Sequence, residues 1–318
     1  MIPSENRATE LTLGLYLPQV FKGRFAAAAL KIANKLGLIK HVLPKLIVPD
    51  IETREEPETL PFTQNDIDSG RVGFLLGNPE HGYARAVAVN SGEEISVIKW
   101  SELSGAGALE RECKNIELLN ANKVRGVPSV VSYGRNSTSF WFETTYFPRV
   151  CVSSVCDRRA IELLQSWIVD GFVSPLENKH VASLWAMEGW APDREELATL
   201  EGLKIRKAVV HGDFTVWNLR TGSEGLMAID WEWAVPDGIA GLDLCYGLLQ
   251  EALLKKKLTS SRALRYVRRM VDNPVCKAYL EFVGWHDCLD LWLKTGVLHL
   301  HSKRNNPELL KEAWDNNG

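Results

Sequence analysis

The sequence has no excess of charge of either sign. It contains 37 lysines and arginines against 40 aspartates and glutamates, and its formal net charge is -3. A chain without a strong basic surplus is not expected to bind nucleic acid through a general electrostatic surface. Hydrophobic residues make up 45% of the chain and charged residues 24%, which excludes wholesale disorder. With 318 residues, the chain is long enough for about two domains.

Long apolar runs and close cysteine pairs are also lacking. The longest apolar stretch, residues 25–30, is interrupted by Lys31, whereas a helix that spans a bilayer needs about 20 apolar residues. The same stretch makes a poor signal peptide. The six cysteines form no CxxC pair and show no short disulfide-scaffold spacing, which favours a reducing compartment and predicts a cytoplasmic location.

The N-terminal region differs in charge pattern from the rest of the chain. Lysines and arginines from position 22 to position 45 have no acid among them and are followed by an acidic, proline-containing segment at 49–61. Residues 1–68 are therefore expected to form an extension with a basic amphipathic helix and an acidic linker. This helix either packs on the main body or leaves residues 20–48 for a weak contact with an anionic membrane surface or a partner. Its apolar stripe consists of Phe25, Ala28, Ala29, Ile32, Leu36 and Ile39.

The pattern of residues 69–147 predicts a small antiparallel sheet with one helix. Short strand-like segments alternate with turn sequences, as in a meander. Between the third and fourth segments, residues 107–120 carry apolar positions at helical spacing, and Gly126 and Pro128 end that pattern. The predicted strands are residues 73–76, 84–89, 95–100, 128–134 and 139–146.

Helical periodicity predominates in residues 148–318. The longest predicted helices include residues 158–172, 242–257 and 278–294, and one hairpin interrupts the helical pattern. A small sheet domain followed by a mainly helical domain makes the expected fold class α+β.

The interrupting hairpin contains the residues with the clearest chemical meaning. Residues 211–234 consist of two strand-like segments around a glycine-rich turn at 221–225. Folding this hairpin is expected to place Asn218 opposite Asp230, which brings an amide oxygen and a carboxylate together. Such oxygen donors, with other positions left to water and phosphate, suit Mg²⁺. Asp213 precedes the first strand, where it can act as a base or orient an attacking hydroxyl.

The segment HGDFTVWN resembles the catalytic loop of protein-kinase-like enzymes, in which an aspartate precedes an asparagine by five residues. With HGD in the loop and IDWE in place of DFG, the chain is similar to the aminoglycoside phosphotransferase and choline kinase family. This resemblance implies a two-lobed protein-kinase-like fold that binds ATP and Mg²⁺. It also implies that Asp213 is the catalytic base, that Asn218 and Asp230 hold Mg²⁺, and that His211 braces the loop.

Strand alternation and helix spacing independently predict a buried ion pair. Lys99 shares a strand face with the apolar Ile95 and Val97, so its ammonium needs a partner. In the following helix, Glu112 interrupts an apolar stripe, whereas Glu110 falls on another face. We expect Lys99 to pair with Glu112, and the family resemblance implies that both serve nucleotide binding. The alternative is a strand-end lysine and a helix-edge glutamate that both reach solvent.

Two further nucleotide contacts follow from the resemblance. The segment GNPEHG lacks the spacing of GxGxxG, so Gly77 and Gly82 permit either a hairpin that covers ATP or an ordinary hairpin. The resemblance places the link between the lobes just before Pro148. Backbone contacts to adenine are therefore expected at Thr144, Thr145 and Tyr146.

The sequence allows two structural roles for Asp243. It opens a predicted helix, where a carboxylate ordinarily caps the helix N-terminus. In the family that the chain resembles, an aspartate at this place braces the catalytic loop.

Together these features predict transfer of a phosphoryl group from ATP to a hydroxyl of a small molecule such as a sugar, an amino sugar or an amino alcohol. The acids Glu232 and Asp237 are candidates to receive an amine of that acceptor. A protein kinase is disfavoured because the short segment between Asp230 and Asp243 leaves little room for an activation loop. The alternative is a catalytically silent, kinase-like scaffold that binds nucleotide, which the irregular glycine loop favours.

Overall fold

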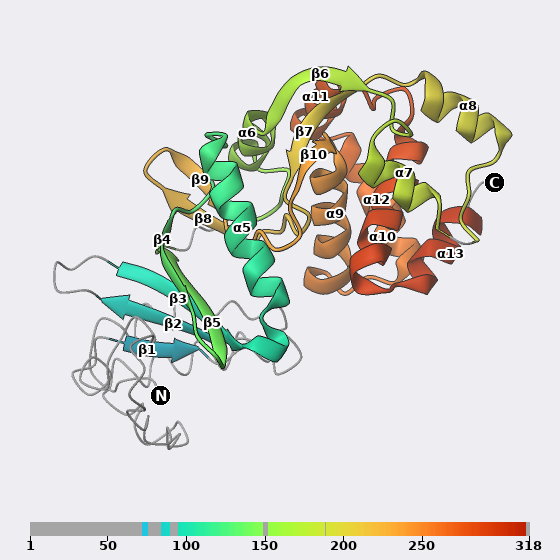
Figure 1. Ribbon diagram of the computed structural model, residues 1–318. Helices are drawn as coiled ribbons and strands as arrows, with labels where there is room; N and C mark the ends of the chain where they lie inside the picture. The colour runs from blue at the N-terminus through green and yellow to red at the C-terminus, as the bar shows by residue number, and fades with distance from the viewer. Residues whose placement is uncertain (1–71, 76–83, 90–94, 149–151, 188, 316–318) are drawn as a thin grey trace. The chain divides into compact units, whose positions relative to one another are not determined.

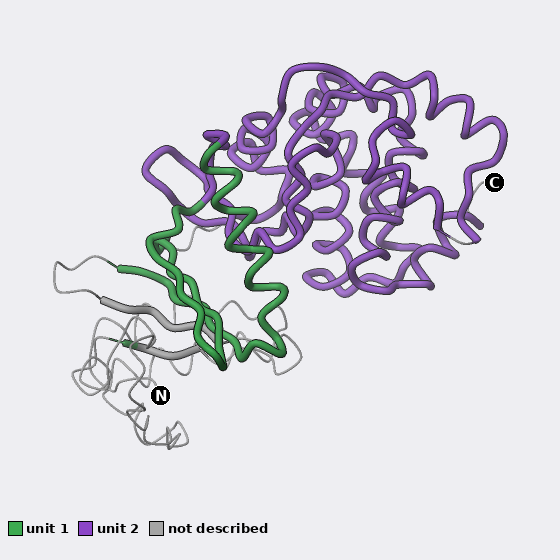
Figure 2. The backbone as a smooth tube through the Cα atoms, viewed as in Figure 1, with its two compact units in different colours: residues 1–121, 128–149 green, residues 122–127, 150–318 purple. Residues whose placement is uncertain are grey.

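The computed structural model describes residues 72–75, 84–89, 95–148, 152–187 and 189–315 (Figure 1). The predicted N-terminal extension, its contact segment 20–48, and the loop with Gly77 and Gly82 lie outside these residues. The chain divides into two compact units (Figure 2). The first comprises Met1–Ala121 and Pro128–Arg149, and the second comprises Asn122–Val127 and Val150–Gly318.

Within the described part of the first unit, antiparallel strands form a five-stranded sheet in the order β1-β2-β3-β5-β4. Helix α5 (Gly107–Ala121) follows β3 after a short 3₁₀ turn and buries its apolar stripe. The meander and the single helix agree with the sequence-based prediction. The strands are β1 (Val72–Leu75), β2 (Ala84–Val89), β3 (Ile95–Glu102), β4 (Val130–Arg135) and β5 (Ser139–Thr145).

The second unit is mainly helical. Its described helices are α6 (Arg158–Ser166), α7 (Lys179–Trp185), α8 (Arg194–Gly202), α9 (Leu242–Gln250), a π-helical turn (Glu251–Lys255), α10 (Ser260–Val271), α11 (Pro274–Val283), α12 (Leu289–Arg304) and α13 (Pro307–Asp315). Its described strands are β6 (Ile168–Val173), β7 (Ile205–Val210), β8 (Leu219–Gly222), β9 (Gly225–Ala228) and β10 (Val235–Ile239). The fold is therefore α+β, as predicted.

Two long helices predicted from periodicity are interrupted. The predicted helix at 158–172 ends at Ser166, and Ile168–Val173 instead forms β6, which pairs with β7. Its β-branched and aromatic side chains favour a strand once a partner strand is present. The predicted helix at 278–294 is divided by Gly284, which ends α11 in the left-handed region before α12 begins.

Helix α9 lies at the centre of the second unit, because every residue of Leu242–Gln250 is buried. In Figure 1 it runs beside α12, which packs against it. The helix begins at Gly241, whose φ of +95° is strained for any residue with a side chain. The indole nitrogens of Trp285 and Trp292 donate to the carbonyl oxygens of Ala240 and Gly241, each at 2.9 Å. These contacts fix the N-terminus of α9.

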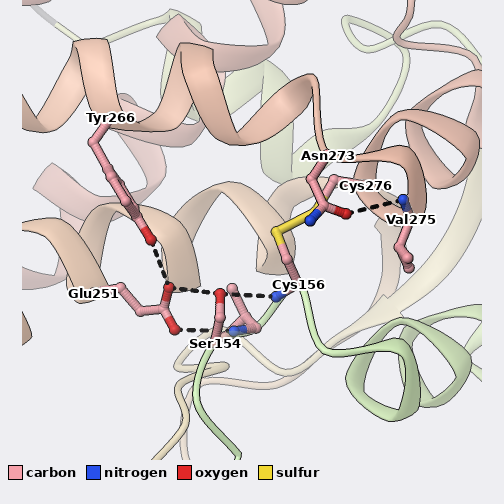
Figure 3. Close-up of a disulfide and its surroundings, with 8 residues drawn as sticks. Ser154, Cys156, Glu251, Tyr266, Asn273, Val275 and Cys276 are labelled. Carbon is pink, nitrogen blue, oxygen red and sulfur yellow. Dashed lines mark hydrogen bonds between the residues drawn. A yellow bond between two sulfur atoms is a disulfide. The ribbon is translucent and has the colours of Figure 1, made fainter.

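A disulfide links Cys156, just before α6, to Cys276 in α11 (Figure 3). The two cysteines are 120 residues apart, so spacing along the chain could not indicate their pairing. The expectation of reduced cysteines is therefore wrong for this pair, and the cysteines no longer favour a reducing compartment. Cys113, Cys245 and Cys288 are free thiols.

None of the helices in the described ranges combines the length and the apolar character needed to cross a membrane.

Candidate active site

The predicted catalytic loop follows β7 directly and is held by Asp243. The carboxylate of Asp243, in the first turn of α9, accepts hydrogen bonds from the backbone nitrogens of His211 (2.7 Å) and Gly212 (2.8 Å). Gly212 has a φ of +85°, and a side chain there would collide with the carbonyl oxygen of Trp233. Asp243 therefore braces the loop, the second of its two sequence-based interpretations.

His211 links the loop to the end of the hairpin. Its Nδ1 accepts a hydrogen bond from the backbone nitrogen of Asp213 at 3.1 Å, and its Nε2 lies 2.9 Å from the carbonyl oxygen of Ile229. This pattern requires a neutral imidazole with its proton on Nε2. The ring is fully buried against Trp231, with 4.4 Å between ring centroids. His211 therefore holds the loop in place, as the family resemblance implies.

Asp213 is buried, and its two carboxylate oxygens differ. Oδ2 accepts a hydrogen bond from Nδ2 of Asn218 at 3.2 Å and lies 3.4 Å from Nη2 of Arg304. Oδ1 is buried and has no hydrogen-bond partner among the residues that the structure describes. Burial raises the pKa of the Asp213 carboxyl, and the Arg304 guanidinium opposes that shift. Oδ1 can therefore accept a hydrogen bond from a bound molecule.

The hairpin brings Asn218 close to Asp230 with a register shifted by one residue from the prediction. Strands β8 and β9 pair Leu219 with Ala228, and the backbone nitrogen of Ile229 donates to the carbonyl oxygen of Asn218 at 3.0 Å. Asn218 therefore lies opposite Ile229, and Asp230 follows. The charge of Asp230 also contributes to the raised pKa of Asp213, which is consistent with two neighbouring carboxyls.

The chain turns sharply at Asp230, whose φ of +68° is uncommon for a residue other than glycine. Such strained positions cluster at functional sites.

The side-chain amide of Asn218 has a defined orientation. Its Nδ2 donates to the backbone carbonyl oxygen of Asp213 at 3.0 Å and also to Oδ2 of Asp213, so the amide oxygen of Asn218 points the opposite way.

These donors fit a divalent metal that keeps several ligands outside the protein. An amide oxygen and a carboxylate are hard ligands, and Mg²⁺ in phosphoryl-transfer sites is bound by one or two such groups together with water and substrate phosphates. No cluster of three or more histidine, cysteine, aspartate or glutamate side chains able to hold a metal occurs among the described residues. The donor set therefore suits a nucleotide-bound Mg²⁺ better than a metal held by the protein alone.

The first unit contains the predicted buried ion pair. Nζ of Lys99 in β3 lies 2.6 and 2.7 Å from the two carboxylate oxygens of Glu112 in α5, and both residues are buried. Glu110 instead pairs at the surface with Arg135. The choice of Glu112 over Glu110 from helix spacing is therefore confirmed.

The segment predicted to contact adenine lies at the end of β5. The backbone nitrogen of Thr145 donates to Ser129, and that of Tyr146 donates to Ile95, each at 3.2 Å. The sheet thus uses both amides, so backbone contacts from them to adenine are not available. A contact through carbonyl oxygens of Thr144, Thr145 or Tyr146 stays a prediction.

Sequence reasoning missed the contribution of α12. Its last turn carries Lys303 and Arg304, and Arg304 also donates from Nε to the hydroxyl of Tyr246 at 3.3 Å. Arg304 is 91 residues from Asp213 along the chain. The only local sequence signal for this contact is a basic pair at a helix C-terminus. Such a pair is just as typical of side chains that interact only with the helix dipole.

No protein-family model and no curated protein matches the chain. Solved structures match it at low identity. An amicoumacin kinase in complex with AMP-PNP, Ca²⁺ and Ami is 12% identical, with 77% of this chain and 87% of that chain covered and a TM-score of 0.44. The apo form of a thermostable mutant of aminoglycoside phosphotransferase APH(4)-Ia is 13% identical, with 77% and 91% covered and a TM-score of 0.45. Choline kinase LicA from Streptococcus pneumoniae is 15% identical, with 77% and 91% covered and a TM-score of 0.35.

Aminoglycoside phosphotransferases and a choline kinase, the family that the sequence resembles, are thus among the structural matches. At these TM-scores and identities, the assignment of the site rests on its residues.

Proposed function

We propose that the chain is an ATP- and Mg²⁺-dependent phosphotransferase that phosphorylates a hydroxyl of a small molecule. The observation that supports this most directly is the unpartnered, buried Oδ1 of Asp213 on a loop braced by Asp243 and His211. A carboxylate oxygen fixed in this way can accept the proton of a hydroxyl group. The neighbouring Asn218 and Asp230 supply the oxygens that a nucleotide-bound metal requires.

In the proposed reaction, Oδ1 of Asp213 takes the proton of the acceptor hydroxyl. The hydroxyl oxygen forms a bond to the γ-phosphorus of ATP while the bond from that phosphorus to the bridging oxygen breaks and ADP leaves. Asn218 keeps the carboxylate turned toward the acceptor through its hydrogen bond to Oδ2. Mg²⁺ held by Asn218 and Asp230 would offset the phosphate charge. In the first unit, Lys99 held by Glu112 is the cation that we assign to the nucleotide phosphates.

The base assignment is tested with Asp213→Asn. This variant should retain MgATP binding in calorimetry, while turnover falls by about 10² to 10⁴, the range typical of a lost general base. The matched control is Asp290→Asn, an exposed aspartate at the start of α12 that pairs with Arg268. Turnover of Asp213→Asn equal to that of the control would remove Asp213 from the mechanism.

The assignment of Asp230 as a metal ligand is tested with Asp230→Ala. Loss of this carboxylate should weaken nucleotide binding in the presence of Mg²⁺ and leave binding of metal-free nucleotide nearly unchanged, because the metal loses a protein ligand. Calorimetry with and without Mg²⁺ measures the two nucleotide affinities separately. An MgATP affinity equal to that of the parent protein would overturn the assignment.

A screen of ATP consumption against alcohols of different classes tests the activity as a whole. Sugars, amino sugars, amino alcohols, hydroxy acids and sugar phosphates cover neutral, cationic and anionic acceptors. Transfer to any of them supports the phosphotransferase. MgATP binding without transfer to any class would favour the silent nucleotide-binding scaffold instead.

A further inference from the structure

The last turn of α12 brings two cations to the catalytic loop from one side. Nη2 of Arg304 lies 3.4 Å from Oδ2 of Asp213. Nζ of Lys303 lies against the backbone of Gly212, where it would meet any side chain at that position, and sits 5.2 Å from the centre of the Trp233 ring. Consecutive residues of one helix thus reach both Asp213 and the residue before it.

Both cations keep hydrogen-bond donors that no contact within the described part of the chain uses. Lys303 forms no hydrogen bond or ion pair there, and burial lowers the pKa of its ammonium to about 8. Arg304 uses Nε for Tyr246 and Nη2 for Asp213, and its side chain is 45% exposed. A guanidinium has five N–H donors, and these two contacts use no more than two of them.

Three acids surround the two cations, but their direct contacts with them are few: Arg304 contacts Asp213, and Lys303 has an ion pair with none of the three. The charged groups that face Lys303 are Asp243, Asp213, Arg304 and Glu232. Both oxygens of Asp243 already accept backbone hydrogen bonds, and Oδ2 of Asp213 is shared with Asn218. Glu232 remains as a partly exposed acid without direct contact to Nζ.

Of the two acids expected to bind an amine, Glu232 lies among the groups around Lys303, whereas Asp237 does not belong to this arrangement. Asp237 has a side chain that is 84% exposed and lies 4.0 Å from Lys207 of β7. An ammonium beside Arg304 would be repelled by the guanidinium, because like charges repel. A carboxylate or a phosphate in the same place would accept two parallel hydrogen bonds from the guanidinium.

We propose that the acceptor is an anionic alcohol, one that carries a carboxylate or a phosphate near its reacting hydroxyl, and that Arg304 and Lys303 bind this group. This proposal rests on the proposed phosphotransferase function and narrows its range of acceptors. Hydroxy acids and phosphorylated alcohols should be better acceptors than cationic amino sugars and amino alcohols. Arg304 is then a specificity residue beside the base.

The first test compares acceptors that differ mainly in charge: glucose, glucosamine, glucuronate and glucose 6-phosphate, with MgATP as donor. We expect kcat/KM for one of the anionic acceptors to exceed the values for glucose and glucosamine at least tenfold. Arg304→Gln and Lys303→Met should each raise KM for that anionic acceptor about tenfold while the MgATP affinity stays within twofold. Arg268→Gln, which removes an exposed arginine paired with Asp290, is the matched control and should change neither quantity.

Two results would overturn the proposal while leaving the phosphotransferase intact. One is a preference for glucosamine or glucose over both anionic acceptors. The other is a fall in kcat for all acceptors alike in Arg304→Gln without a change in KM, which would assign Arg304 to the transferred phosphate. Urea unfolding of each variant identifies any loss of folded protein.

A binding measurement tests the anion site without turnover. Inorganic phosphate alone should raise the thermal midpoint of the parent protein, and this shift should be lost in Arg304→Gln and retained in Lys99→Met. Such a shift without transfer to any acceptor would support the anion site and count against the phosphotransferase. No phosphate shift in the parent protein, or a shift that survives in Arg304→Gln and disappears in Lys99→Met, would overturn the anion site.

Discussion

Oδ2 of Asp243 accepts a hydrogen bond from the backbone nitrogen of His211 at 2.7 Å, and this contact ties the first turn of α9 to the loop that we predict to be catalytic. The other oxygen accepts from Gly212 at 2.8 Å. Because Trp285 and Trp292 fix the start of α9, the position of the loop is set by the core of the second unit.

Asp243→Asn should therefore damage both stability and activity. An asparagine offers one acceptor oxygen, so its NH₂ group would face a backbone N–H that needs an acceptor. Leaving a buried donor unsatisfied costs about 1–3 kcal/mol, which should appear in the free energy of unfolding from urea titration. Asp237→Asn, at an exposed position, is the control. Equal unfolding free energies in the two variants would show that the brace contributes nothing.

The Lys99–Glu112 pair should behave as one unit. Lys99→Met leaves a buried carboxylate without its cation, and Glu112→Gln leaves a buried ammonium without its anion, so each should destabilise the protein by about 3–5 kcal/mol and weaken nucleotide binding. The double variant should cost clearly less than the sum, because the second change removes a group that is already unpaired. Unfolding titrations and nucleotide calorimetry measure both effects.

Glu110→Gln is the matched control on the same helix. Glu110 pairs with Arg135 at the surface, where ion pairs contribute about 0–1 kcal/mol. Strictly additive losses at Lys99 and Glu112, or a loss at Glu110 as large as that at Glu112, would contradict the paired arrangement.

The ion pair was predictable because its two residues lie on neighbouring elements with clear periods. Alternation in a strand and the 3.6-residue repeat of a helix define which side each residue faces. The hairpin was predictable for the same reason, and its register differs by one residue because Ser223 and Glu224 form a two-residue loop between paired Gly222 and Gly225.

The contacts of Arg304 with Asp213 and of Cys156 with Cys276 could not be predicted in this way. Each joins segments that are roughly a hundred residues apart along the chain. Their proximity depends on how α12 packs against α9 and how α11 packs near α6, and local sequence patterns do not encode such packing. Strand β6 was missed for a related reason, since its pairing with β7 outweighs the local helical pattern.

Reduction of the disulfide should lower stability without changing the site directly. A cross-link across a long stretch of chain restricts the unfolded state, and its removal typically costs about 2–5 kcal/mol. Cys156→Ser with Cys276→Ser should therefore lower the thermal midpoint, and a reductant should lower the midpoint of the parent protein but not that of the double variant. Cys288→Ser, at a free thiol, is the control. A midpoint that is insensitive to reductant in the parent protein would show that the bond is absent in solution.

The pH dependence of the reaction should report the contact between Arg304 and Asp213. A base must be ionised to accept a proton, so kcat/KM falls as the pH drops through the pKa of Asp213. Burial raises that pKa, and the guanidinium of Arg304 stabilises the carboxylate and opposes the rise. Arg304→Gln should therefore raise the pKa of Asp213 further and move the acid limb of the kcat/KM profile to higher pH. Lys303→Met should move it the same way by less, because Lys303 contributes less to lowering that pKa. Arg268→Gln should leave the limb in place, and an acid limb that stays or moves to lower pH in Arg304→Gln would mean that Asp213 is not the group that titrates.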